Sequence, residues 1–507
     1  ITWGDSSSGS GGGDSSSVAD QLTSVKSISA TGYTFAAIRI DGTVVTWGAN
    51  SMGGDSSSVA DQLTDVRSIA GSERAFAAVK ADGSVVTWGV SNNGSDSSSV
   101  DDKLVDIRSI TATHNSFAAI KADGSVVTWG SHSHGGNSRP VASQLTNIQS
   151  IVGNYGAFAA LRADGVVVTW GYDPYGGDSD YVADQLTDVR EIISTFSAFS
   201  AIKTDGSVVT WGGASSGGDS GEVSDQLTLV QAIYSTRSAF AAINGEGSIV
   251  TWGFASSGAD TRSMQDRLIG VKSISATNDA FAAIKDDGSV VAWGNYSNGA
   301  NTNGVSYDLN QVQSISATDR AFAALKADGT VVAWGNGATN VPGQLGPVQT
   351  IVGTQGVFAV IKDDGSVATW GNPSSGGNGS LEDGELTQVK SITGNYGALA
   401  AIKTDGSVFT WGGASSGGDS SSVESELTTV VSIASNDRAF AAVKEDGTVV
   451  TWGEGRYGAD SSSVVGQLTQ VKSIYASKGS FAAYKNNGSV VTWGWGCGGS
   501  DSGSASV

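Results

Sequence analysis

Few residues of this chain combine the type and the spacing that metal binding requires. His132 and His134 flank one serine, and the chain holds 3 histidines and 1 cysteine. A zinc site needs three or four His, Cys or carboxylate ligands, and the pair has no Cys or carboxylate at ligand spacing. An ordinary polar loop is therefore the better interpretation, and we predict no metal site.

Carboxylates are abundant, but they recur instead of converging on one place. A tight pair ending in Gly appears twelve times along the chain, from Asp41-Gly42 to Asn487-Gly488, and ten of the pairs begin with Asp. A catalytic acid or base acts in single copy, whereas a residue repeated in every period serves the fold. We therefore predict no catalytic residues and expect that the protein is not an enzyme.

The segment 53–58, Gly-Gly-Asp-Ser-Ser-Ser, recurs in similar form and carries the remaining chemical signal. Its carboxylate, hydroxyl and carbonyl oxygens suit calcium. Asp followed by Ser is equally typical of caps and Asx turns, and the calcium-binding β-helix repeat is absent. We predict no cofactor, with calcium as the alternative.

Charge and composition exclude several classes of protein. The net charge is −21, from 49 acidic against 28 basic residues, which argues against the clustered cations that nucleic-acid binding requires. No apolar run approaches the roughly 20 residues of a membrane span, and a single cysteine, Cys497, allows no internal disulfide. The compartment is left open. The chain begins with Ile1-Thr2-Trp3-Gly4, the end of a repeat, so we expect a fragment of a longer array.

The organising unit is a run of 14 residues from Phe76 to Gly89 that recurs along the whole chain and ends in Trp-Gly. The tryptophans are separated by 44 residues once, 41 seven times, 36 once and 41 three times, which makes twelve periods. Such regularity is typical of propellers and solenoids. The repeat tryptophans are Trp3, Trp47, Trp88, Trp129, Trp170, Trp211, Trp252, Trp293, Trp334, Trp370, Trp411, Trp452 and Trp493.

Each period predicts three β-strands. In the second period, a strand begins at 66–69, and 76–79 and 85–88 form a hairpin around Asp82-Gly83, a pair that favours a type I′ turn with positive φ at both residues. A fourth strand in the Gly/Ser loop is an alternative, and 58–63 predicts one helical turn capped by a serine. Both faces of the last strand are apolar, so each sheet must lie between two others. The sequence predicts an all-β fold of tandem blade-like repeats of about 41 residues.

Two zones vary between periods, one before the Phe and one after Trp-Gly. Variable tips on a rigid framework are how repeat proteins build recognition surfaces. The candidate interaction residues in these zones are Tyr33, Arg74, His114, Tyr155, Tyr172, Tyr175, Phe196, Arg237, Tyr296, Arg320, Tyr396, Arg438 and Tyr457.

The run Phe-Ala-Ala-Ile-Lys-x-Asp-Gly-Ser-Val-Val-x-Trp-Gly, together with the shortened period through Val331–Asn336, Asn340–Leu345 and Val348–Ile351, is similar to the repeats of the regulator of chromosome condensation family. That family includes the bacterial propeller-type β-lactamase inhibitory protein. The resemblance covers essentially the whole chain and implies blades of β-propeller type. The histidine that the family commonly carries before the apolar strand is missing at 72–76, and no long insertion resembles the wedge of its nucleotide-exchange members.

The resemblance favours tandem propellers, with repeats 1–7 in residues 1–294 and repeats 8–12 plus the start of a further repeat in 295–507. An open superhelical stack of blades is the alternative, and a single ring of twelve blades is a third arrangement. The shortened period at 335–370 is a candidate seam.

We expect a non-enzymatic scaffold for protein–protein interaction through the variable tips. The alternative is a structural or surface-assembly protein, such as a filament, coat or adhesive element, built from the array itself. The expected partner is accordingly another protein or a second copy of the chain, with no nucleic acid and no membrane span.

Overall fold

The computed structural model describes residues 25–31, 34–336, 345, 347–354, 356–377, 386–476, 479–487 and 489–494. Contacts divide the chain into two compact units. Unit 1 holds Ile1–Ser97 and Gly397–Val507, and unit 2 holds Ser98–Tyr396. Trp3 and most of the shortened segment after Asn336 lie outside the described residues.

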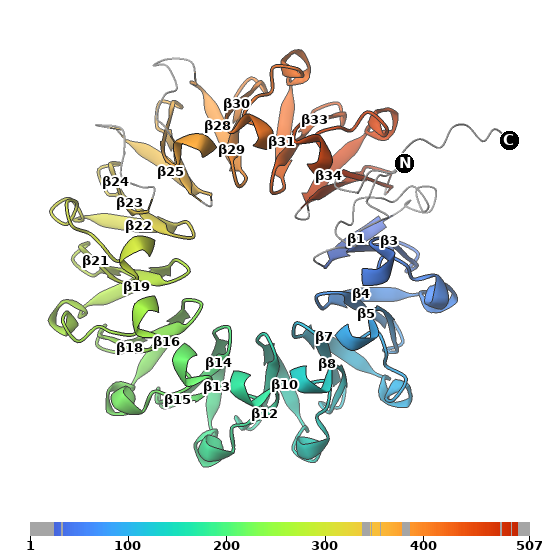
Figure 1. The fold of residues 1–507 in the computed structure, drawn as a ribbon, viewed down its shortest axis with the longest axis vertical. Coiled ribbons are helices and arrows are strands. Elements are labelled where there is room, and N and C mark those ends of the chain that lie inside the picture. Colours follow the sequence, from blue (N-terminus) through green and yellow to red (C-terminus); the bar gives the residue numbers. More distant parts are fainter. Residues whose placement is uncertain are drawn as a thin grey trace. The chain divides into compact units, whose positions relative to one another are not determined.

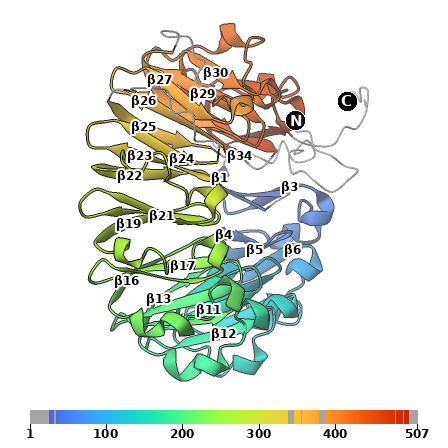
Figure 2. The same ribbon diagram turned by 60° about the vertical axis from the view of Figure 1, so that its left-hand side comes forward.

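Twelve three-stranded antiparallel sheets make up the described chain, each with its strands in sequence order. In unit 2, Figures 1 and 2 show successive sheets lying side by side in chain order. The first strands are β1 Val25–Ala30, β4 Val66–Gly71, β7 Ile107–Ala112, β10 Ile148–Gly153, β13 Val189–Ser194, β16 Val230–Ser235, β19 Val271–Ala276, β22 Val312–Ala317, β25 Val348–Gly353, β28 Val389–Gly394, β31 Val430–Ser435 and β34 Val471–Ala476.

The middle strands carry the Phe-Ala-Ala run, and the third strands end at Trp-Gly. The middle strands are β2 Thr34–Arg39, β5 Ala75–Lys80, β8 Ser116–Lys121, β11 Ala157–Arg162, β14 Ala198–Lys203, β17 Ala239–Asn244, β20 Ala280–Lys285, β23 Ala321–Lys326, β26 Val357–Lys362, β29 Ala398–Lys403, β32 Ala439–Lys444 and β35 Ser480–Lys485. The third strands are β3 Val44–Gly48, β6 Val85–Gly89, β9 Val126–Gly130, β12 Val167–Gly171, β15 Val208–Gly212, β18 Ile249–Gly253, β21 Val290–Gly294, β24 Val331–Gly335, β27 Val367–Gly371, β30 Val408–Gly412, β33 Val449–Gly453 and β36 Val490–Gly494.

Short 3₁₀ helices follow the third strands. Those directly after Trp-Gly are η2 Asn50–Met52, η4 Ser91–Asn93, η6 His132–His134, η8 Asp173–Tyr175, η10 Ala214–Ser216, η12 Ala255–Ser257, η14 Tyr296–Asn298, η15 Pro373–Ser375, η16 Ala414–Ser416 and η18 Gly455–Tyr457. Those before the next first strand are η3 Ser57–Gln62, η5 Asp101–Lys103, η7 Arg139–Val141, η9 Asp180–Gln185, η11 Gly221–Gln226, η13 Gln265–Arg267, η17 Glu424–Glu426 and η19 Val465–Gln467.

The prediction of an all-β chain of tandem blade-like repeats is confirmed. The predicted helical turn near 58–63 is η3, and these helices occupy the loop where a fourth strand was the alternative. Ser56 is the N-cap of η3, but its side chain does not cap the helix. Its hydroxyl instead accepts a hydrogen bond from Thr46 Oγ1 at 2.7 Å, while the carboxylate of Asp55 accepts one from the Ser57 N–H at 2.8 Å.

The predicted type I′ geometry of the hairpin turn is wrong. Lys80 N–H donates to the Ser84 carbonyl at 2.8 Å and Gly83 N–H to the Lys80 carbonyl at 3.0 Å, which closes a three-residue loop. Gly83 has φ +81°, and Asp82 is not among the non-glycine residues with positive φ. A turn followed by a left-handed glycine bulge has this pattern. Asp82 contributes its side chain instead, accepting from the Ser84 N–H at 2.9 Å and the Ser84 hydroxyl at 2.7 Å.

The turn glycine is also the joint between neighbouring sheets. The Gly206 carbonyl accepts a hydrogen bond from Val230 N–H, at the start of the next sheet, at 2.7 Å. A Cβ added to Gly206 would lie 2.6 Å from Leu229 Cα. The same backbone bond links Gly42 to Val66 at 2.7 Å and Gly447 to Val471 at 2.7 Å. Glycine is therefore required both by its positive φ and by the close approach of the next repeat.

Most third-strand tryptophans stack on the phenylalanine of their own sheet, and several donate a hydrogen bond to the preceding loop, whereas Trp411 lies opposite Leu399. Trp211 stacks on Phe199 with centroids 5.4 Å apart, and its indole N–H donates to the Gly176 carbonyl at 3.1 Å. The pair is buried against Ala157, Ala159 and other apolar residues of the preceding sheet. These contacts form the core between sheets that the two-sided apolar strand predicts.

Two packing contacts bear on how the array is divided. Within unit 1, the first described sheet packs on the last, with Phe35 and Trp47 against Ala482 and Val490. Within unit 2, Ala280 and Ala282 of β20 pack on Phe322 of the next sheet, so the core continues past residue 294 as it does between other sheets. The division into propellers at 294/295 stays a prediction.

We predict that Trp211→Ala lowers the free energy of unfolding by about 3–5 kcal/mol, because it empties a fully buried site. Trp211→Phe keeps a ring on Phe199 but leaves the buried Gly176 carbonyl without its donor, so a loss of about 1–3 kcal/mol is expected. Denaturant unfolding measures both losses, and hydrogen exchange in β14 and β15 localises them. Equal losses for the two variants would contradict the role of the stack.

The contact between the turn glycine and the next sheet leads to a second prediction. Gly206→Ala suffers a left-handed backbone cost of about 1–2 kcal/mol and in addition must displace the Leu229 backbone, 2.6 Å away. Gly304 is a matched control because it has φ +93° and a Cβ added there would meet nothing within 4 Å. Gly304→Ala should therefore cost only the backbone term. Thermal unfolding of both variants checks the difference, and equal melting temperatures would refute the joint.

Candidate functional site

The turn between the first and the middle strand of a sheet is here called the tip. In several periods, the polar residue directly after the first strand ties the two variable zones to each other. Asn154 Nδ2 donates to the Tyr175 carbonyl at 2.7 Å, and Asn154 Oδ1 accepts from the Ala157 N–H at 2.9 Å. Thr113 Oγ1 donates to the His134 carbonyl at 3.0 Å, and Thr195 makes the equivalent bond to the Ser216 carbonyl at 2.9 Å. The tip between the first and middle strands is therefore tied to the 3₁₀ helix that follows Trp-Gly.

The tips of unit 2 are joined to one another by a backbone ladder, which we call the tip ladder. The N–H of His114 donates to the Tyr155 carbonyl, Tyr155 to Phe196 and Phe196 to Arg237, at 3.2, 3.4 and 3.2 Å. It continues from Arg237 to Asn278 at 3.0 Å and from Asn278 to Asp319 at 3.1 Å. Equivalent side chains of successive repeats consequently project beside one another.

This register stacks four predicted residues in one column. His114 lies 4.4 Å from Tyr155 between ring centroids, at an interplanar angle of 19°. Tyr155 lies 4.7 Å from Phe196, and the guanidinium carbon of Arg237 lies 5.1 Å from the centre of the Phe196 ring. Tyr155 and Phe196 are therefore each contacted by two neighbouring residues of the tip ladder.

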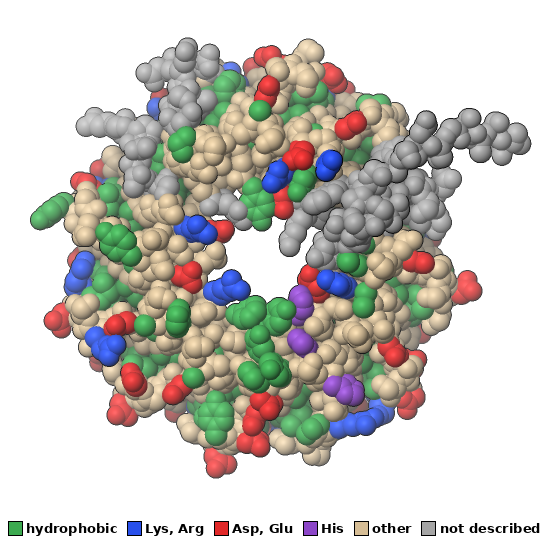
Figure 3. All heavy atoms as spheres, in the orientation of Figure 1, with side chains coloured by type: hydrophobic (Ala, Val, Ile, Leu, Met, Phe, Trp, Pro, Cys, Tyr) green, Lys and Arg blue, Asp and Glu red, His purple; other side chains and the backbone are tan. Residues whose placement is uncertain are grey.

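A second row of rings comes from the loops after Trp-Gly. Tyr172 and Tyr175 lie 5.3 Å apart, and Tyr175 lies 5.6 Å from Tyr155 and 5.7 Å from Phe196. His134, in η6, lies 6.0 Å from Tyr155 and 6.5 Å from Tyr172. We call His114, His134, Tyr155, Tyr172, Tyr175 and Phe196 the aromatic patch; in Figure 3 hydrophobic and histidine side chains gather beside each other on this face.

The patch is partly exposed although its rings touch. Tyr172 is 44% exposed and Phe196 37% exposed, while Asp173 is also exposed and stands directly after Tyr172. Burial lowers the pKa of His134 below its usual value, and the nearby His114 lowers this pKa further. Protonation of His134 is thus disfavoured in the folded chain.

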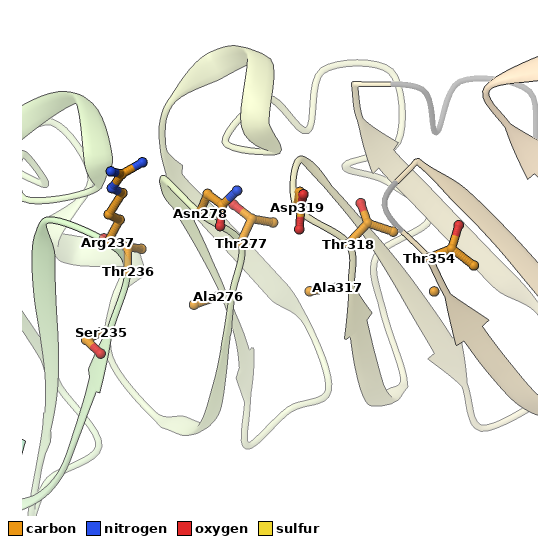
Figure 4. A pocket seen from close by; sticks show the side chains of 11 residues that line it. Ser235, Thr236, Arg237, Ala276, Thr277, Asn278, Ala317, Thr318, Asp319 and Thr354 are labelled. Atoms are coloured by element: carbon orange, nitrogen blue, oxygen red, sulfur yellow. The ribbon is translucent and has the colours of Figure 1, made fainter. Parts of the chain in front are cut away.

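A polar hollow of about 520 Å³ adjoins the patch at Arg237. Figure 4 shows its row of threonines, one from each of four successive periods, with Arg237, Asn278 and Asp319 at the tips. The threonine hydroxyls are already used by the chain: Thr236 donates to the Ser257 carbonyl at 3.1 Å and Thr277 to the Asn298 carbonyl at 2.9 Å. The adjustable groups of the hollow are therefore those at the tips.

The structure brings six of the predicted residues together, namely His114, Tyr155, Tyr172, Tyr175, Phe196 and Arg237. Tyr33 lies outside the described residues. In unit 1, Arg74 is half-buried and Arg438 lies over Tyr457 at 5.5 Å. In unit 2, Tyr296, Arg320 and Tyr396 are exposed at the corresponding tips and loops of other periods.

His134 is the residue of the aromatic patch that sequence reasoning missed. The sequence suggested it only as a weak metal ligand beside His132, whereas the structure gives it two ring contacts in the patch. The available signal was that all 3 histidines occur between residues 114 and 134, with His114 and His134 one period before Tyr155 and Tyr175.

The carboxylates of the Gly/Ser loops serve turns. Asp55, Asp419 and Asp460 each accept the N–H of the residue two positions later, at 2.8, 2.9 and 3.0 Å, and hydrogen bonds from Ser57 lower the pKa of Asp55. Within the described ranges, no group of three or more His, Cys, Asp or Glu side chains is placed to hold a metal ion. The calcium alternative stays a prediction. No helix in the described parts of the chain is long and apolar enough to cross a membrane.

Comparison with known proteins gives structural neighbours among propeller-type repeat proteins. The CRINKLY WD40 ectodomain of the receptor kinase ACR4 from Arabidopsis thaliana is 17% identical over 50% of this chain and 90% of that one, with a TM-score of 0.25. Prp20p from Saccharomyces cerevisiae is 18% identical over 46% and 73%, with a TM-score of 0.26, and human WBSCR16 is 16% identical over 42% and 74%, with a TM-score of 0.26. No family model matches the chain, and no curated protein sequence matches it.

The histidine pair makes a prediction. Because burial and His114 disfavour the charged form of His134, the folded chain binds its proton less readily than the unfolded chain does. This contribution to stability is complete above the ordinary histidine pKa of 6.5 and is lost as the pH falls below it. NMR titration of labelled histidine should show a His134 pKa below 6.5 that rises in His114→Asn. An unchanged pKa in that variant would contradict the coupling.

Proposed function

We propose that this chain is a non-enzymatic scaffold that binds another protein through the hairpin tips and adjoining loops of unit 2. The observation that carries the proposal is the aromatic patch, a contiguous set of partly exposed rings supplied by neighbouring repeats. At the position of Tyr172–Tyr175, other periods carry Gly-Ala-Ser-Ser, as in 213–216 and 413–416. Exposed aromatic clusters on soluble proteins mark interaction sites, and tyrosine is enriched among the residues that dominate binding energy.

The framework supports this role because it is rigid where it repeats and variable where it is exposed. The Asn154 clamp and the tip ladder hold the rings in place before binding, which lowers the entropic cost of forming an interface. On the sequence motif alone, we also assign the repeats to the regulator of chromosome condensation type. The alternative, a self-assembling structural protein, is an outcome of the test below.

The test replaces Tyr172-Asp173-Pro174-Tyr175 with Gly-Ala-Ser-Ser, a loop this fold already accommodates at 213–216. Phe254→Gly is the matched control, since Phe254 holds the same repeat position two periods later and is 49% exposed. We expect a stoichiometric partner, captured from the cells that produce the chain and then purified, to bind the wild type and the control but to bind the loop variant at least about tenfold more weakly.

The outcomes separate the functions. Equal binding by the loop variant would refute the role of the patch. Concentration-dependent assembly of the purified wild type that is absent in the loop variant, measured by light scattering, would favour the structural alternative and count against the scaffold.

A further inference from the structure

A groove of about 320 Å³ lies in unit 2, outside the aromatic patch, and we call it the Gly253 groove. Residues 251–253 at the end of β18 line it, together with residues of the loops 214–223 and 255–265, which belong to two successive repeats. A cavity of this size suits a small organic group. Its charged side chains are Asp219, Glu222, Asp260 and Arg262.

One period earlier, the chain places a side chain of its own at the corresponding position. Tyr181 stands 41 residues before Glu222, and Gly212 stands 41 residues before Gly253. The Gly212 N–H donates a hydrogen bond to the Tyr181 hydroxyl at 3.1 Å, and burial raises the pKa of Tyr181. The tyrosine thus reaches from η9 of one repeat to the third strand of the next. The fold therefore accepts a phenol at this place.

The Gly253 N–H has the orientation that Gly212 uses for this bond. Gly253 pairs with Ala239, and the following N–H, that of Phe254, donates to the Ser238 carbonyl at 2.9 Å. Because the inter-strand bonds of an antiparallel pair alternate along the strand, the Gly253 N–H points away from β17. β18 is the last strand of its sheet, and within the described residues this N–H has no acceptor. It is therefore a backbone donor at the edge of the sheet that lines the groove.

The side chains around this donor make the groove acidic. Asp260 accepts two hydrogen bonds from the guanidinium of Arg262, at 3.1 and 3.2 Å. Hydrogen bonding to Asp260 raises the pKa of Arg262, and the charges of Asp260 and Glu222 raise it further. Arg262 and Asp260 neutralise each other, so the groove keeps the negative charge of Asp219 and Glu222. Carboxylates accept strong hydrogen bonds from hydroxyl groups and repel anions.

We infer that the Gly253 groove binds a tyrosine side chain of the partner protein. The phenol oxygen accepts the Gly253 N–H, as the oxygen of Tyr181 accepts the N–H one period earlier. The phenol proton is donated to the carboxylate of Asp219 or Glu222. Ala214, Val223 and Ala255 supply apolar surface for the ring.

Tyrosine fits such a place because one end of its side chain is apolar and the other forms hydrogen bonds. The inference rests on the proposed scaffold function, to which it adds a second contact of stated chemistry outside the aromatic patch.

The experiment uses the full chain and three small probes: N-acetyl-tyrosinamide, N-acetyl-phenylalaninamide and N-acetyl-O-phosphotyrosinamide. Ligand-observed NMR titration measures Kd for each probe. We expect the tyrosine probe to bind best and the phenylalanine probe to bind about two- to tenfold more weakly, because it lacks the hydroxyl and its hydrogen bonds. The phosphorylated probe should bind more weakly still, since its phosphate meets the carboxylates of the groove.

The decisive variant is Glu222→Tyr, which gives the Gly253 groove the tyrosine that Tyr181 provides one period earlier. It should weaken binding of the tyrosine probe by at least about tenfold, because a tethered ring competes at high effective concentration. Ser99→Tyr is the matched control, since Ser99 is exposed and holds the same repeat position three periods earlier. This control should bind the probe as the wild type does.

The same two variants are then tested with the purified partner, which should bind Glu222→Tyr more weakly than Ser99→Tyr. Equal binding of the tyrosine and phenylalanine probes, or wild-type binding of the tyrosine probe by Glu222→Tyr, would overturn the inference.

The remaining outcomes separate the groove from the scaffold function. If the partner binds both variants equally, the inference fails, and the loop-replacement experiment decides the scaffold function by itself. If the purified wild type self-associates and Glu222→Tyr does not, the occupant is a second copy of the chain, and the inference of a partner's tyrosine fails.

Discussion

The contact on which the array depends is the approach of each first strand to the hairpin turn of the sheet before it. Val230 N–H reaches the Gly206 carbonyl at 2.7 Å, with Leu229 packed where a Cβ would be. Leu229 itself has φ +52°, which disfavours most residues with a Cβ. The turn glycine and the residue before the next strand, here Gly206 and Leu229, thus fix the spacing between sheets. The Trp–Phe stack fills the interior that this spacing creates.

The joint also determines where variation is tolerated. The turn, the Phe-Ala-Ala strand and Trp-Gly all contact the next or the preceding repeat, so a change in any of them propagates between sheets. The opposite ends of the sheets carry the tips, whose backbone needs are met by the tip ladder and by clamps such as Asn154. Their side chains are therefore free to differ, and the chemistry of unit 2 varies along the tips without altering the core.

The repeat, its strands and its variable zones could be predicted from the sequence because each depends on local spacing. The turn type could not be predicted, because the conformation of the left-handed glycine depends on its contact with the next sheet as well as on its own hairpin. Nor could the patch be recognised as one surface. Tyr155 and Phe196 are 41 residues apart, and only the tip ladder brings their rings to 4.7 Å.

The aromatic patch shows how a stacked column limits the ring faces that remain for another molecule. Tyr155 lies between His114 and Phe196, and Phe196 lies between Tyr155 and Arg237, so the column largely uses the faces of these rings for itself. The second row closes over Gly156, which is buried and whose Cβ position lies 3.4–3.6 Å from His134, Tyr175 and Tyr172. The repeat supplies the frame for a ring and a cation, as Arg438 over Tyr457 shows at 5.5 Å, whereas around Tyr175 the neighbouring rings fill that frame.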